Sequence, residues 1–99
     1  MVIDGKSRKE VLKVSVSGRI DGTAAPELES YLDNNLSGIK KIEFDFNNVE
    51  YISSAGLRVL LKAQKKVASD EGHVLIKHMN DSVKAIFDLT GFSDLFVIK

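Results

Sequence analysis

Apolar and polar residues alternate with period two in two stretches of the chain, and this pattern predicts half-buried β-strands. Residues typical of turns end both stretches, Gly18 the first and Asn47-Asn48 the second. The positions expected on the buried face are Leu12, Val14 and Val16 in the first stretch and Ile42, Phe44 and Phe46 in the second. The predicted strands are residues 10–18 and 40–48, with shorter ones at 73–77 and 95–99 and a short edge strand at 2–5.

Three other segments place apolar residues three or four positions apart, which predicts helices. These helices are expected at residues 23–36, Ser54–Ser69 and 81–90. Each is flanked by residues that favour helix ends. The expected N-caps are Thr23, Ser53 and Asn80, and the expected terminating glycines are Gly38, Gly72 and Gly91. The apolar positions of the third helix are Val83, Ile86, Phe87 and Leu89.

Strands and helices alternate along the chain, which predicts an α/β fold. The strand at 41–47, the helix at 54–69 and the strand at 73–77 should form one right-handed βαβ unit with parallel strands. An antiparallel pairing of the first two long strands is left open and would make the sheet mixed. We expect a single domain over residues 1–99, with a mixed β-sheet of four to five strands and three main helices.

Composition narrows the class of protein. The 99 residues suit one domain, and 14 Lys and Arg residues balance 14 Asp and Glu residues. A net charge of zero argues against nucleic acid as a partner, because phosphate binding needs an excess of basic residues. No apolar run is long enough to cross a membrane and no signal peptide opens the chain, so we expect a cytoplasmic protein without a membrane partner.

Candidate chemistry is sparse. The chain has no cysteine, and His73 and His78 lack a third ligand at the spacing of a metal site, so we expect no metal and no other cofactor. No phosphate-binding glycine motif occurs, so nucleotide binding has no support in the residues. No serine has a recognisable base near it in the sequence. We therefore expect that the protein is not an enzyme.

The junction between the second long strand and the second helix is the most informative segment. It has the sequence YISSAGLRVLL over residues 51–61, with Ser53 as the expected N-cap and Ser54 as the first helical residue. A helix N-terminus favours negative charge, so a phosphate on a hydroxyl here would be tolerated. Serine is also a common N-cap with no further role, and chemistry alone favours that simpler interpretation.

This segment resembles the signature loop and helix of the STAS domain family, in particular its stand-alone bacterial anti-sigma factor antagonists. The similarity continues in SGRIDGTAAPELES at residues 17–30, with a Gly-x-x-Asp turn at Gly18 and Asp21, and in VKAIFDLTGFSDLFVI at residues 83–98. It therefore covers nearly the whole chain with the spacing intact.

The resemblance implies a phosphorylation switch. It places the phosphate acceptor on Ser54, with Ser53 as a second choice. The partners it implies are an anti-sigma factor with serine kinase activity, which binds the unphosphorylated form, and a serine phosphatase that restores this form. The implied partner-binding residues are Asp21, Ser53, Ser54, Ala55, Gly56 and Arg58. For the chain itself we expect a monomer or a weak homodimer.

Two positions depart from the family pattern. Ser53 stands where the family has an aspartate before the acceptor, and Ala55 stands where some members have a hydroxyl residue. These departures leave room for an alternative function, a phosphorylation-independent STAS module in a larger regulatory or transport assembly.

Overall fold

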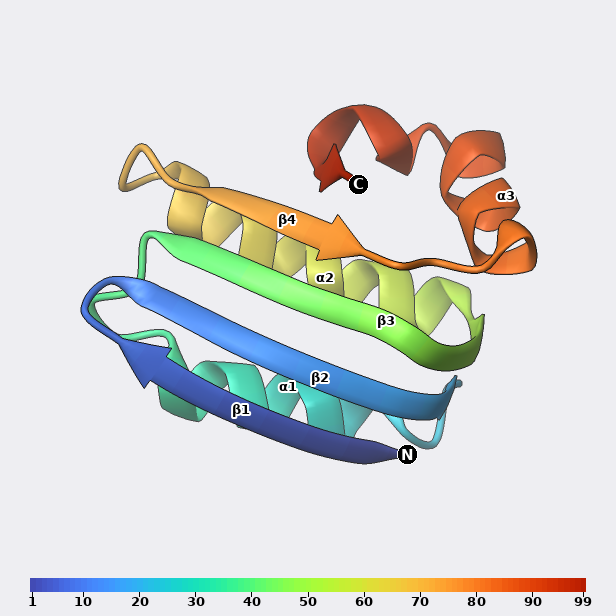
Figure 1. Cartoon of the computed structure of the whole chain (residues 1–99), viewed down its shortest axis with the longest axis horizontal. Coiled ribbons are helices and arrows are strands. Elements are labelled where there is room, and N and C mark those ends of the chain that lie inside the picture. The colour runs from blue at the N-terminus through green and yellow to red at the C-terminus, as the bar shows by residue number, and fades with distance from the viewer.

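The computed structural model describes residues 1–99 and contains one five-stranded sheet (Figure 1). Its strands lie in chain order and are β1 (Val2–Arg8), β2 (Val11–Ile20), β3 (Lys41–Ile52), β4 (His73–Lys77) and β5 (Val97–Ile98). The pair β1–β2 is antiparallel and the other three pairs are parallel. The sheet is therefore mixed, as expected. The antiparallel pairing of the two long strands, which the sequence left open, is wrong: β2 and β3 are parallel, and the antiparallel neighbour of β2 is β1.

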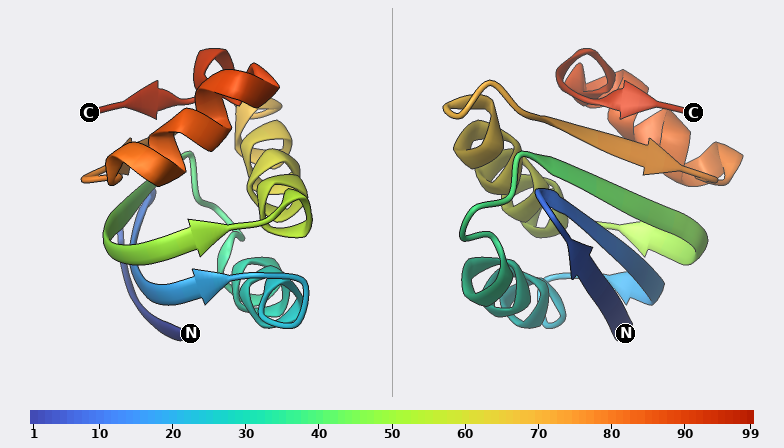
Figure 2. Two further views of the ribbon diagram at one scale, coloured as in Figure 1. Left: turned by 90° about the vertical axis from the view of Figure 1, so that its right-hand side faces the viewer. Right: turned by 60° about the vertical axis from the view of Figure 1, so that its left-hand side comes forward.

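The helices are α1 (Ala25–Asn35), α2 (Ser54–Ala68) and α3 (Asp81–Thr90), followed by the short 3₁₀ helix η1 (Phe92–Leu95). Both α1 and α2 lie on the same side of the sheet, and no helix covers the opposite side of β1 and β2 (Figure 2). The elements β3, α2 and β4 form the predicted right-handed βαβ unit (Figure 1). Because all βα connections leave the carboxyl ends of the parallel strands, the loops after β2 and β3 lie at one end of the sheet.

The alternating pattern correctly predicts which face of the two long strands is buried. Every second residue is buried from Leu12 to Val16 in β2 and from Ile42 to Phe46 in β3. In the whole chain, 24 buried residues form one continuous apolar cluster. Burial of this apolar surface is the main favourable contribution to folding. The polar residues between them face the open side of the sheet. Leu89 differs from expectation: its side chain is 88% exposed, because it projects from the outer side of α3.

Both long strands continue past the residues that were expected to end them. Strand β3 runs through Asn47 and Asn48, where the pairing with β2 shifts in register between Ser15 and Ser17. At this irregularity the carboxylate of Asp45 accepts a hydrogen bond from the Asn47 backbone N–H (2.9 Å), so the strand continues without leaving that donor unpaired. Strand β2 passes Gly18 at a positive φ of 95° and reaches Ile20.

Three local predictions at element ends are wrong. Thr23 does not cap α1: Ala24 occupies the N-cap position without a side-chain hydrogen bond, and the Thr23 hydroxyl donates to Asp21. The left-handed residue after α2 is Glu71 (φ 63°) and not Gly72. Gly72 is required for a different reason, because a Cβ there would lie 1.8 Å from the carbonyl oxygen of Lys40. The predicted strand at residues 95–99 shrinks to Val97–Ile98, since η1 occupies the preceding residues.

The N-caps of the other two helices are confirmed. Ser53 caps α2 and Asn80 caps α3, where the Asn80 side chain accepts from the Val83 N–H (2.8 Å) and donates to the Val49 carbonyl (3.0 Å). Helix α3 is thereby fixed to the far end of β3. Its last turn closes at Gly91 in the left-handed conformation (φ 77°), as predicted.

Candidate functional site

The predicted site lies where the loop after β2 and the loop after β3 meet. The two loops are joined by a hydrogen bond from the Ser53 backbone N–H to the Ile20 carbonyl (2.9 Å). The chain turns from β2 through residues 21–24 into α1, and from β3 through Ser53 into α2. The N-terminal ends of both helices therefore lie at the same end of the sheet (Figure 2).

The two adjacent hydroxyls differ in what they do. Ser53 has an extended backbone, and its Oγ accepts a hydrogen bond from the Gly56 N–H (3.3 Å). Its side chain is half-buried, whereas Ser54, the first residue of α2, is exposed. Ser53 is therefore engaged as a helix cap, and Ser54 presents its hydroxyl to solvent at the positive end of the helix dipole.

Gly56 does not form part of the surface, contrary to the expectation that it contributes to an open partner-binding rim. It is buried, and a Cβ at this position would lie 2.8 Å from side-chain carbons of both Ile20 and Ile52. The glycine lets the first turn of α2 pack directly on the ends of β2 and β3. Its close packing on these two strand ends fixes the position of Ser54 and Ala55.

Asp21 organises the neighbouring loop. Its Oδ1 accepts hydrogen bonds from the Thr23 N–H (3.1 Å), the Thr23 hydroxyl (2.8 Å) and the Ala24 N–H (3.0 Å). These hydrogen bonds, above all the one from the Thr23 hydroxyl, lower the pKa of Asp21 below its ordinary value because they stabilise the ionised form. Asp21 thus holds a fixed negative charge beside the N-terminus of α1.

Arg58 and Ala55 line a shallow depression between α1 and α2 with a volume of about 320 Å³. Arg58 is exposed and lies four residues after Ser54, so both project from the same side of α2. The remaining lining residues are Gly22, Ala25, Pro26, Glu29 and Val59. Ser54, Ala55, Arg58 and the Asp21 loop therefore form one accessible surface, which we call the α2 rim.

One contact near the α2 rim, between Arg19 and Tyr51, was not predicted from the sequence. The guanidinium of Arg19 lies 4.5 Å from the centre of the Tyr51 ring, in a cation–π contact between the C-terminal ends of β2 and β3. Only the pairing of Arg19 with Tyr51 across the parallel strands brings these residues together. No local sequence pattern reports such a register.

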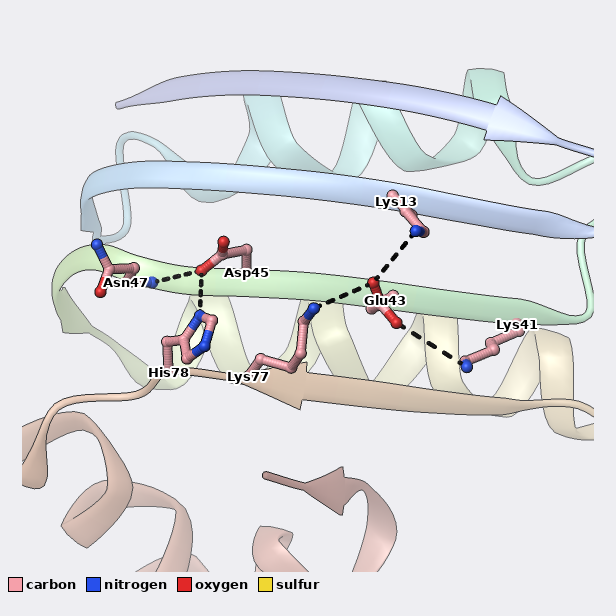
Figure 3. Close-up of polar contacts among 7 residues, drawn as sticks. All are labelled: Lys13, Lys41, Glu43, Asp45, Asn47, Lys77 and His78. Carbon is pink, nitrogen blue, oxygen red and sulfur yellow. Dashed lines mark hydrogen bonds and ion pairs between the residues drawn. The ribbon is translucent and has the colours of Figure 1, made fainter.

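A second group of charged residues occupies the open side of the sheet, as Figure 3 shows. Glu43 is within 4.0 Å of three lysines, the shortest distance being 3.3 Å to Lys77 Nζ. Asp45 contacts His78 Nδ1 (3.1 Å), and the hydrogen bond from the Asn47 N–H, followed by the one from His78, lowers the pKa of Asp45. These contacts link β2, β3 and β4 on the side of the sheet away from α1 and α2.

No group of three or more His, Cys, Asp or Glu side chains is arranged to hold a metal ion. No helix is both long enough and apolar enough to span a lipid bilayer.

Comparison with known proteins identifies the family. The model of the STAS domain family matches residues 3–99, so the chain belongs to the STAS domain family. Among curated proteins, it is 28% identical over 94 residues to an anti-sigma-B factor antagonist of Staphylococcus aureus, an alignment that covers 94% of this chain and 87% of that protein.

Solved structures agree with this assignment. An anti-sigma factor antagonist from Mycobacterium paratuberculosis superposes with a TM-score of 0.85 at 26% identity, covering 98% of this chain and 83% of that one. SpoIIAA in its unphosphorylated form, an anti-sigma factor antagonist, superposes with a TM-score of 0.79 over 99% of this chain and 87% of that one, at 12% identity. At that identity the likeness concerns the fold alone.

Proposed function

We propose that this domain is an anti-sigma factor antagonist whose binding to its partner is switched by phosphorylation of Ser54. The observation that carries the proposal is the exposed hydroxyl of Ser54 at the N-terminus of α2, within a STAS domain whose relatives include proteins named as anti-sigma factor antagonists. The unmodified α2 rim would bind an anti-sigma factor, which would release a sigma factor for transcription in the cytoplasm.

The charge of the phosphate explains why modification changes binding without unfolding the domain. A phosphoserine carries roughly −1.5 to −2 charges at pH 7. At position 54 that charge meets the unpaired N–H groups of the first helical turn and lies on the same side of α2 as the Arg58 guanidinium. The fold accommodates the anion, so the change is read by the partner, which would have to bury a doubly charged group.

The substitution at position 53 fits the same proposal. Serine caps a helix about as well as aspartate, and Ser53 makes the capping hydrogen bond to Gly56. The geometry of the loop is therefore retained, while one negative charge next to the acceptor is lost. A kinase that acts on this domain would have to recognise a loop without that charge.

We infer that the partner is an anti-sigma factor that is itself a serine kinase, and that a serine phosphatase reverses the modification. Incubation with such a kinase and ATP should place one phosphate on the peptide that contains residues 53 and 54, and fragmentation should locate it on Ser54. The Ser53→Ala variant should still be phosphorylated and the Ser54→Ala variant should not. A phosphate located elsewhere in the chain would remove the mechanism.

The alternative is a phosphorylation-independent STAS module in a larger assembly. It is favoured by the absence of the acidic residue at position 53 and of a hydroxyl at position 55. Purification of the native complex, with and without phosphatase treatment, separates the two proposals. Recovery of the same partner in equal amount from both samples would support the module, whereas an increase after phosphatase treatment supports the switch.

A further inference from the structure

The outer edge of β1 is free. Strand β1 pairs with β2 on one side only, and on its other side no strand follows (Figure 1). Six of its seven residues are exposed, the exception being the half-buried Ile3. The opposite edge of the sheet is formed by β5, which has only two residues. The long β1 edge is therefore the principal place where the sheet could be extended.

The β1–β2 turn determines which backbone groups point outward. The connection has two residues, Lys9 and Glu10, with Lys9 at a positive φ of 56°. In an antiparallel hairpin of this length the flanking pair, here Arg8 and Val11, exchanges hydrogen bonds, and every second pair does so after it. The N–H and C=O groups of the intervening residues point to the free edge; these residues are Ile3, Gly5 and Ser7.

We propose that a second copy of this chain pairs with this edge, antiparallel and with the two-fold axis at Gly5. In this register the outward-facing residues meet one another: Gly5 meets Gly5, and Ile3 meets Ser7 twice. Asp4 of each copy then stands directly opposite Lys6 of the other copy, in the close non-hydrogen-bonded type of pair. The edge is thus complementary to itself in both hydrogen bonding and charge.

The charges involved have no other partner. Neither Asp4 nor Lys6 forms an ion pair within the chain, although eight other pairs are present. Both side chains lie on the open side of the sheet, beside Lys13 and Ser15 of β2. In the proposed dimer two symmetric Asp4–Lys6 pairs would form on that side.

Two other antiparallel registers, with the two-fold axis at Ser7 or at Ile3, are less favourable than the register at Gly5. Moving the axis to Ser7 places Lys6 opposite Arg8, which is a like-charge pair and destabilising. Moving it to Ile3 leaves only residues 1–5 to pair and forms no ion pair. Only the axis at Gly5 uses the full length of the strand.

The interface would be small. A single pair of seven-residue strands lies at the low end of the size range of specific interfaces, so the dimer should be weak and dependent on protein concentration. Sedimentation velocity from about 10 µM to about 1 mM protein covers the affinity range expected for such an interface. The weight-average sedimentation coefficient should rise with concentration toward the dimer value.

Charge variants test the register. Lys6→Glu and Asp4→Lys each turn two attractive pairs into repulsive ones and should weaken association about tenfold or more. The double variant Asp4→Lys/Lys6→Asp restores opposite charges and should recover association. Circular dichroism of each variant controls for folding. Ser7→Pro removes an outward N–H without touching the pairing with β2 and should also weaken the dimer while leaving the monomer folded.

A wild-type chain that stays monomeric at about 1 mM protein and low salt would overturn the proposal. So would self-association that none of the charge variants changes, because the contact would then lie elsewhere. Failure of the double variant to associate would overturn the register at Gly5. None of these results depends on whether Ser54 is phosphorylated.

Discussion

At the scale of single residues, the α2 rim combines two groups that fix the backbone with one that is left free. The Ser53 hydroxyl accepts a hydrogen bond from the Gly56 backbone N–H, and the Asp21 carboxylate accepts one from the Ala24 backbone N–H. Ser54 directly follows the capping residue as the first residue of α2, and its side chain is exposed. A kinase can reach a serine whose hydroxyl is exposed. A partner can detect the modification because the loops around this hydroxyl are held in place by hydrogen bonds.

Gly56 is a residue whose role can be tested by adding one carbon atom. Gly56→Ala places a Cβ within 2.9 Å of Ile20 and Ile52 atoms, including the Ile20 carbonyl oxygen, so either the helix or the strand end must move. We expect a loss of about 1–3 kcal/mol in the free energy of unfolding, measured with urea. Gly22→Ala is the matched control: no atom lies within 4 Å of its Cβ, and it should change stability by less than about 1 kcal/mol. Equal losses in both variants would contradict this role of Gly56.

The lowered pKa of Asp21 predicts how the stability of the fold depends on pH. Its pKa is lowered in the folded chain from the ordinary value of 3.8, because the Thr23 hydroxyl and the Ala24 N–H stabilise the ionised carboxylate. A carboxylate with a lowered folded pKa stabilises the fold above its unfolded pKa, and that stabilisation disappears as the pH falls through the folded pKa. An NMR titration should therefore give Asp21 a pKa below 3.8. Asp21→Asn, which keeps a hydrogen-bond acceptor, should lose less stability than the wild type between pH 5 and pH 2. A titration at or above the ordinary value would contradict the hydrogen-bond assignment.

At the scale of elements, α2 joins the site to the rest of the fold. Its apolar side packs on the sheet, and Lys62 on its outer side contacts Glu29 (3.2 Å) and Asp33 (3.4 Å) of α1. The sequence places Lys62 on the wetter side of a helix, but only the packing of α1 beside α2 shows its acidic partners. These contacts are exposed, so they orient the two helices more than they stabilise them.

The N-terminus of α2 should accept a negative charge without loss of stability. Ser54→Asp puts a carboxylate at the first helical residue, where the helix dipole favours it, and we expect a change between zero and a gain of about 1 kcal/mol. Ala68→Asp, at the exposed last residue of the same helix, is the matched control and should be destabilising by about 0.5–1.5 kcal/mol. Urea unfolding of both variants gives the comparison. A clear destabilisation by Ser54→Asp would mean that the fold itself, and not a partner, responds to charge at the rim.

At the scale of the whole molecule, local patterns predicted most elements and the βαβ unit of β3, α2 and β4, but not the other relations between elements. Period-two alternation located the buried faces of β2 and β3, and cap residues located the starts of α2 and α3, because these signals depend on neighbours in the sequence. The parallel pairing of β2 with β3, the burial of Gly56 and the Arg19–Tyr51 contact depend on residues about 30 positions apart. Such distant contacts leave no periodic signal. The exposed Ser54 was predictable because an N-cap and the residue after it are defined locally.

The proposed function requires that the whole domain stay folded while its surface changes charge. The central claim is therefore tested most directly by the affinity of the anti-sigma partner for two samples of the same chain, unmodified and phosphorylated on Ser54. Titration calorimetry should show binding to the unmodified domain and an affinity at least about tenfold lower, or 1.4 kcal/mol weaker, for the phosphorylated domain. The melting temperatures of the two samples should be nearly equal. Equal affinities for both samples would contradict the account.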